Sequence, residues 1–91
     1  MNPFINRMNY TEQEIHQNFA GNLAFLRLTR TPPLSQKALA RLLNLSCYAI
    51  NHYESGGTMP SAYALYRISI YFGIPMETLL TTDLQTKGKE N

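Results

Sequence analysis

The sequence predicts an all-α protein with five helices in one domain, and three observations lead to this fold class. Apolar residues recur at intervals of three and four along most of the chain, which is the spacing of one helix face. Ser or Thr residues precede several of these segments, as expected of helix N-caps. A chain of 91 residues is long enough for a single hydrophobic core and too short for two domains.

The first helix is expected from about Thr11 to about Arg30. Thr11 and Glu14 have the spacing of a capping box, in which each side chain accepts a hydrogen bond from the other residue's backbone amide. The consecutive prolines after Thr31 end this helix, because proline lacks an N–H and forces the preceding residue out of helical geometry. Residues 1–10 are expected to form an N-terminal tail. The apolar face of the helix consists of Ile15, Phe19, Leu23 and Leu26.

Two short helices follow, over residues 36–43 and 47–54. Ser35 and Ser46 are suited to cap them. Asn44 is suited to end the first of the two, because Asn tolerates a left-handed backbone. Two short helices joined by a three-residue turn make a helix-turn-helix candidate. The core side of the first of them is expected to consist of Leu39, Leu42 and Leu43.

The glycine-containing segment 55–60 is a loop, and Ser61 caps a fourth helix over residues 62–72. Gly73 ends that helix, and Pro75 fits the first turn of a fifth helix that runs to Leu80. The predicted domain spans residues 11–81, followed by a polar C-terminal tail over residues 82–91. The core stripe of the fourth helix is expected to consist of Leu65, Ile68 and Phe72.

The composition excludes several classes of function. A single cysteine rules out an internal disulfide and any zinc site built from cysteine pairs, and His16 and His52 are too few and too far apart for a metal site. The sequence has no acid–base pair or phosphate-binding loop, so we expect no enzyme, no cofactor and no metal. No apolar run approaches the roughly 18 residues of a membrane span. We therefore expect a cytoplasmic protein without a membrane partner.

The helix over residues 47–54 has two different faces. Ala49, Ile50 and Tyr53 share a stripe that should face the core. The residues on the other side can form hydrogen bonds but carry no full charge, whereas a merely solvated face usually carries Lys and Glu. Such a patch suits the edges of base pairs, where donors and acceptors matter more than net charge. The outward patch consists of Cys47, Tyr48, Asn51 and His52.

The segment from Leu34 to Ser46 and its continuation from Ala49 to Gly56 resemble the Cro/repressor (XRE-type) helix-turn-helix family. Ala40 falls where this family needs a small residue for close helix crossing, and Ile50 falls at its buried aliphatic position. The resemblance covers about Asn22 to Leu80. It implies a lambda-repressor-like DNA-binding domain of bacterial or phage origin.

The resemblance also implies roles for individual residues. Cys47, Tyr48, Asn51 and His52 would read bases. An ion pair between Arg27 and Glu54 would link the first helix to the end of the recognition helix. Contacts to the DNA backbone would come from Gln36, Lys37, Arg41, Ser46, Ser55, Thr58 and Ser61.

The function predicted from these observations is sequence-specific regulation of transcription, by default as a repressor. With eight Lys and Arg residues against six Asp and Glu, one copy neutralises few phosphates, so we expect a homodimer on an inverted repeat of double-stranded DNA. Two alternatives stay open: the antitoxin of a toxin–antitoxin pair, and a protein–protein module on the same fold. Apolar surface for an interface is expected at Phe25, Leu28, Tyr63, Tyr66, Ile70 and Tyr71.

Overall fold

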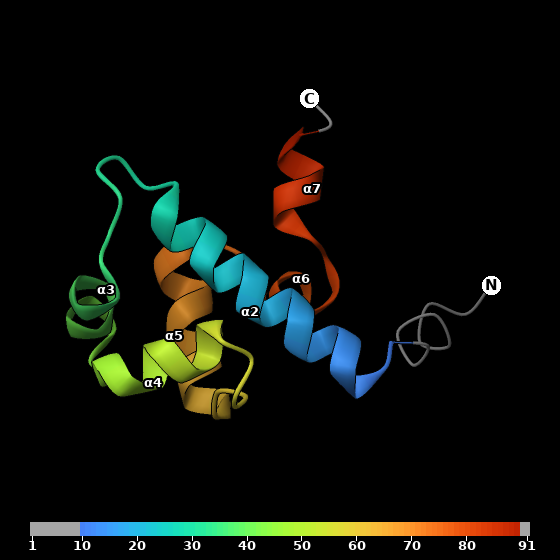
Figure 1. The fold of residues 1–91 in the computed structure, drawn as a ribbon, viewed down its shortest axis with the longest axis horizontal. Helices are drawn as coiled ribbons and strands as arrows, with labels where there is room; N and C mark the ends of the chain where they lie inside the picture. The colour runs from blue at the N-terminus through green and yellow to red at the C-terminus, as the bar shows by residue number, and fades with distance from the viewer. Residues whose placement is uncertain (1–9, 90–91) are drawn as a thin grey trace.

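The computed structural model describes residues 10–89, with side chains through Thr86, and all regular structure in this range is helical (Figure 1). The predicted all-α class is therefore confirmed. The predicted N-terminal tail lies outside the described residues except for Tyr10. The helices are α2 (Glu12–Leu28), α3 (Gln36–Leu43), α4 (Cys47–Glu54), α5 (Ala62–Phe72), α6 (Met76–Thr81) and α7 (Leu84–Lys89).

Helix α2 is the longest element and crosses the middle of the molecule, with α3 and α4 on one side of it and α6 and α7 on the other (Figure 1). The predicted capping box is present: the Thr11 hydroxyl accepts from the Glu14 N–H at 3.0 Å, and the Thr11 N–H donates to the Glu14 carboxylate at 3.2 Å. The helix ends at Leu28, two residues before the predicted end, where the Thr29 hydroxyl donates to the Phe25 carbonyl at 2.7 Å.

The turn between α3 and α4 has the predicted chemistry. Ser35 and Ser46 cap the two helices, each accepting a hydrogen bond from the N–H three residues later. Asn44 adopts the left-handed conformation with φ 58° and ψ 43°. The N–H of Leu45 then donates to the Ala40 carbonyl at 2.8 Å, which closes a Schellman motif at the end of α3.

Helices α5 and α6 also begin and end close to the predicted residues. Ser61 caps α5 through the Ala64 N–H, and Gly73 ends it with φ 68°, a value that favours glycine because it has no Cβ. Pro75 stands at the N-cap of α6, where its missing N–H costs no helical hydrogen bond.

The hydrophobic core receives side chains from all of the helices from α2 to α6, so α2 packs against both the helix-turn-helix and the C-terminal helices. Ile15 and Leu26, at the two ends of the predicted stripe on α2, are only partly buried, and Leu26 packs against the edge of the core. The fully buried aliphatic and aromatic side chains are Phe19, Leu23, Leu39, Leu43, Ile50, Ile68 and Leu79.

Three expectations require correction. The described residues contain one helix more than the predicted five, because residues 84–89, expected within the polar tail, form α7. Leu42, expected in the core, is 50% exposed, whereas Leu39 and Leu43 on the same helix are buried in the core. Tyr71, expected on the outer surface, is partly buried against the core and packs edge-on against Phe72 at a ring-centroid distance of 5.0 Å.

Candidate nucleic-acid interface

The outward face of α4 is an exposed patch formed by Cys47, Tyr48, Asn51 and His52, which we call the α4 patch. Cys47 and Asn51 are exposed, Tyr48 is 73% exposed, and His52 is partly buried. The opposite face holds Ile50 and Tyr53 in the core. The two-faced character predicted from the sequence is thus present in the fold.

Two rings of the α4 patch form a pair. Tyr48 and His52 are one helical turn apart, and their ring centroids lie 4.2 Å from each other with the planes inclined by 37°. The loop that follows α4 is joined to the end of this helix, because the Gly57 N–H donates to the His52 carbonyl at 2.9 Å. A Cβ on Gly57 would lie only 3.3 Å from the His52 Nδ1 atom. A larger residue at position 57 would therefore crowd the imidazole.

Arg27 and Glu54 form a two-point ion pair between α2 and the end of α4. The Arg27 Nε and Nη2 atoms lie 2.7 and 2.8 Å from the two carboxylate oxygens, and the side chains are only 12% and 8% exposed. Hydrogen bonding to the Glu54 carboxylate raises the pKa of Arg27 above its ordinary value. A raised pKa means that this stabilisation is complete at neutral pH and is lost only as the pH rises through the raised pKa in strong alkali. The pair therefore fixes the orientation of α4 throughout the physiological range.

A chain of hydrogen bonds continues from this ion pair to the α4 patch. The Gln36 amide donates to Glu54 Oε1 at 3.0 Å, and the Asn51 amide donates to the Gln36 side-chain oxygen at 3.3 Å. Because a carboxylate only accepts, Glu54 turns the Gln36 nitrogen inward and leaves its oxygen toward Asn51. The Asn51 side-chain oxygen and its second N–H group take no part in this series of hydrogen bonds. Arg27 also donates to the Leu34 carbonyl at 2.8 Å, which ties the start of α3 to the same chain.

The residues predicted to contact the DNA backbone lie on three elements. Lys37 and Arg41 are one turn apart on the exposed side of α3. Ser46 and Ser61 use their hydroxyl oxygens as caps, so their O–H groups can still donate outward. Ser55 lies just after α4, and its hydroxyl donates to the His52 carbonyl at 3.1 Å. Thr58 is exposed in the same loop, and Gln36 is half-buried, where it also donates to the Glu54 carboxylate.

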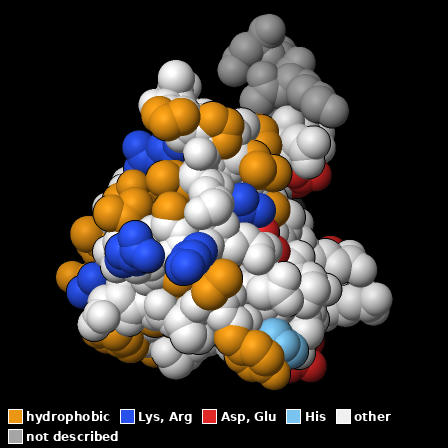
Figure 2. Space-filling model, turned by 60° about the vertical axis from the view of Figure 1, so that its left-hand side comes forward, with side chains coloured by type: hydrophobic (Ala, Val, Ile, Leu, Met, Phe, Trp, Pro, Cys, Tyr) orange, Lys and Arg blue, Asp and Glu red, His pale blue; other side chains and the backbone are white. Residues whose placement is uncertain are grey.

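Figure 2, which brings the α3 side of the molecule forward, shows Lys and Arg side chains lying among hydrophobic ones on that face. Helices α3 and α5 carry Lys37, Arg41 and Arg67 and contain no Asp or Glu. The first turn of α2 carries Glu12 and Glu14 instead. Helices α3 and α5 are therefore basic, whereas the first turn of α2 is acidic.

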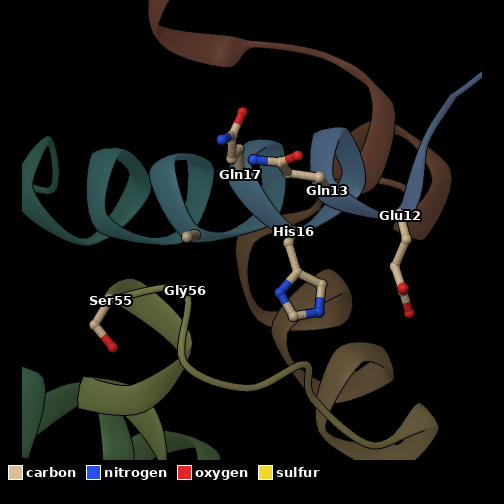
Figure 3. Close-up of a pocket in the computed structure, with 7 residues that line it drawn as sticks. Glu12, Gln13, His16, Gln17, Ser55 and Gly56 are labelled. Carbon is tan, nitrogen blue, oxygen red and sulfur yellow. The ribbon is translucent and has the colours of Figure 1, made fainter.

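An open cleft of about 660 Å³ separates the first half of α2 from the end of α4 (Figure 3). In this view Glu12 and His16 extend from the side of α2 that faces the loop after α4. Gln13 and Gln17 extend from the opposite side of the helix. Ser55 lines the cleft and is also a predicted backbone contact. The cleft therefore borders the predicted DNA surface.

Residues 10–86 hold no group of three His, Cys, Asp or Glu side chains placed to bind a metal ion. Among the described helices, none has both the length and the apolar character that crossing a membrane requires.

Asn22 has a structural role that sequence reasoning missed. It is 2% exposed, and its amide donates to the carbonyls of Leu79 and Thr82 at 2.8 and 2.6 Å while its oxygen accepts from the Leu84 N–H at 2.9 Å. Asn18 makes a similar bond to the Leu80 carbonyl at 3.1 Å. The sequence did contain a signal for this role. Asn22 lies next to Leu23 on the apolar side of the helix, where a buried amide without hydrogen-bond partners would be costly.

Helices α3 and α4, joined by a tight turn and with one face of α4 exposed, form a helix-turn-helix. This arrangement defines the class of protein. The model of the Helix-turn-helix family matches residues 34–79, just over half of the 91-residue chain. The chain belongs to this family, the Cro/repressor (XRE-type) group of DNA-binding helix-turn-helix regulators. Comparison with curated proteins and with solved structures gave no match.

Proposed function

We propose that this chain is a sequence-specific transcriptional repressor that places α4 in the major groove of double-stranded DNA. The observation that carries the proposal is the α4 patch, which offers hydrogen-bonding groups without a full charge on the second helix of the helix-turn-helix. A recognition helix in the major groove meets donors and acceptors that differ for each base pair. The mechanism is occupancy of an operator that overlaps a promoter.

The hydrogen-bond chain gives Asn51 a defined part in base reading. With one N–H donating to Gln36, Asn51 still offers one N–H and its side-chain oxygen. That pair matches the N7 acceptor and the N6 amino group of adenine. The paired rings of Tyr48 and His52 supply an apolar surface for a thymine methyl group and a donor for a guanine acceptor. Cys47, at the first turn of α4, completes the reading surface.

The charge supports binding by two copies. Arg27 is paired with Glu54, so Lys37 and Arg41 supply the positive charge beside the helix-turn-helix, helped by hydroxyl donors at Ser46, Ser55, Thr58 and Ser61. Two cations neutralise few phosphates, so a single copy binds weakly. A homodimer would place two α4 helices one turn of DNA apart, about 34 Å, over an inverted repeat.

Selection from random double-stranded DNA tests this proposal. The wild-type protein should enrich an inverted repeat, and the Tyr48→Ala/His52→Ala variant should not enrich it. Tyr10→Ala, which removes an exposed ring just before α2 and outside both the α4 patch and the expected interface surface, is the control and should enrich the same site. Absence of enrichment by the wild type at low salt, or enrichment of the same site by the patch variant, would contradict base reading by α4.

A further inference from the structure

An apolar groove of about 230 Å³ lies between α3 and α5, away from the α4 patch. Four of the eight large hydrophobic side chains that are exposed in the described part of the chain belong to it or border it: Leu42 at 50%, Tyr63 at 56%, Tyr66 at 52% and Ile70 at 63%. Contiguous apolar surface of this kind marks binding sites in proteins. The groove is lined by Leu42, Leu43, Tyr66, Arg67, Ile70 and Tyr71.

The spacing of these residues favours a helical ligand. Tyr63, Tyr66 and Ile70 stand three and four residues apart, so they form one stripe along α5, and Leu42 of α3 closes the other wall. A groove between two helices accepts the apolar face of an amphipathic helix, which presents its anchors at the same three- and four-residue spacing.

The charge of the groove decides which helix it accepts. Arg67 lines the groove beside Tyr63, with its guanidinium carbon 5.8 Å from the ring centroid and Nη1 3.3 Å from the hydroxyl oxygen. At the Tyr71 end, the Arg30 guanidinium carbon lies 4.8 Å from that ring centroid. No Asp or Glu stands on either α3 or α5. A second copy docked symmetrically would bring like charges together without an acid from these helices to offset them.

We infer that the α3–α5 groove is a docking site for an amphipathic helix of another protein, one whose apolar face is flanked by Asp and Glu. None of the six lining residues belongs to the set proposed to touch DNA, so the domain can bind an operator and this partner through separate surfaces. Through this groove the regulator could recruit a second protein, or respond to one, while it is bound to DNA.

Selection from a phage-displayed library of amphipathic helices tests this inference, using libraries with randomised residues on both sides of a fixed apolar stripe. The immobilised wild-type protein should enrich Asp and Glu beside the stripe. Binding of the enriched peptides should fall at least tenfold with Ile70→Ser, and Arg67→Glu should shift the enrichment toward Lys and Arg. Leu28→Ser, an exposed leucine on α2, is the matched control and should leave peptide binding unchanged.

Three results would overturn the inference: no enriched sequence, enriched sequences without acidic flanks, or binding that is insensitive to Ile70→Ser. Light scattering of the protein alone adds a fourth, because a dimer that Ile70→Ser dissociates would show that a second copy occupies the groove. Circular dichroism establishes that each variant is folded. DNA binding by the Ile70→Ser variant should match the wild type, so failure of the docking inference is distinguishable from failure of the proposed operator binding.

Discussion

The inner and outer faces of α4 are constrained to very different degrees. On the inner face Ile50 is fully buried, and the ring of Tyr53 meets the ring of Phe19 edge-on at 6.0 Å. On the outer face Tyr48 is 73% exposed and contacts the ring of His52 on the same helix. The inner face therefore fixes where the helix lies, while the outer face can vary in chemistry without disturbing the fold. Substitutions on the two faces should separate stability from DNA binding.

The largest effect is expected at the centre of the inner face. Ile50→Ala removes a fully buried side chain and leaves a cavity between α2, α3 and α4, so the free energy of unfolding should fall by about 3 to 4 kcal/mol. Urea denaturation followed by circular dichroism measures this loss. Ile70→Ala, the same change at a side chain that is 63% exposed, should alter stability by less than about 0.5 kcal/mol. Equal losses at both positions would show that α4 is not held by its inner face.

An intermediate effect is expected at the ion pair. Glu54→Ala leaves Arg27 without its carboxylate and Gln36 without its acceptor, and should cost about 2 to 4 kcal/mol, between the values for exposed and fully buried pairs. A double-mutant cycle with Arg27→Ala checks that the two residues act together. Strictly additive losses would show that their contact contributes nothing. Glu54→Gln, which keeps the shape and one acceptor, should lose less.

The smallest effect on stability is expected on the outer face. Asn51→Ala removes an exposed amide, so the free energy of unfolding should change by less than about 0.5 kcal/mol. Affinity for the selected operator should nevertheless fall by about 1 to 3 kcal/mol, the value of one good base contact. Gln17→Ala, which removes an exposed amide from α2, is the control for both measurements. If Asn51→Ala binds the operator like the wild type, Asn51 is not a base reader.

Local sequence signals predicted the elements of the helix-turn-helix closely. Ser35, Ser46 and Ser61 each bond to an N–H three residues away, and Asn44 needs only its own backbone conformation. These signals act within a few residues, so the sequence contains them completely. Helix α7 was missed although Asp83 accepts from the Thr86 N–H at 3.2 Å, the pattern of an N-cap, because the surrounding residues are polar and show no apolar periodicity.

Contacts between distant residues were less accessible to sequence reasoning. The resemblance to the family predicted that Arg27 and Glu54 would pair, but not that Gln36 would extend the pair toward Asn51. The exposure of Leu42 and the partial burial of Tyr71 could not be read from helix periodicity, which gives the relative directions of side chains and not which neighbour covers them.

The sequence by itself determined the class of fold, the ends of α3, α4 and α5 and the division of α4 into two faces, because caps and periodicity depend on neighbours along the chain. Only the tertiary structure decided how α2 holds the helix-turn-helix, through Arg27 and Glu54, and how Asn22 binds the chain after α6. It also decided that the face between α3 and α5 stays open as a groove. These features depend on helices that meet across tens of residues, where packing and not local preference selects the partner.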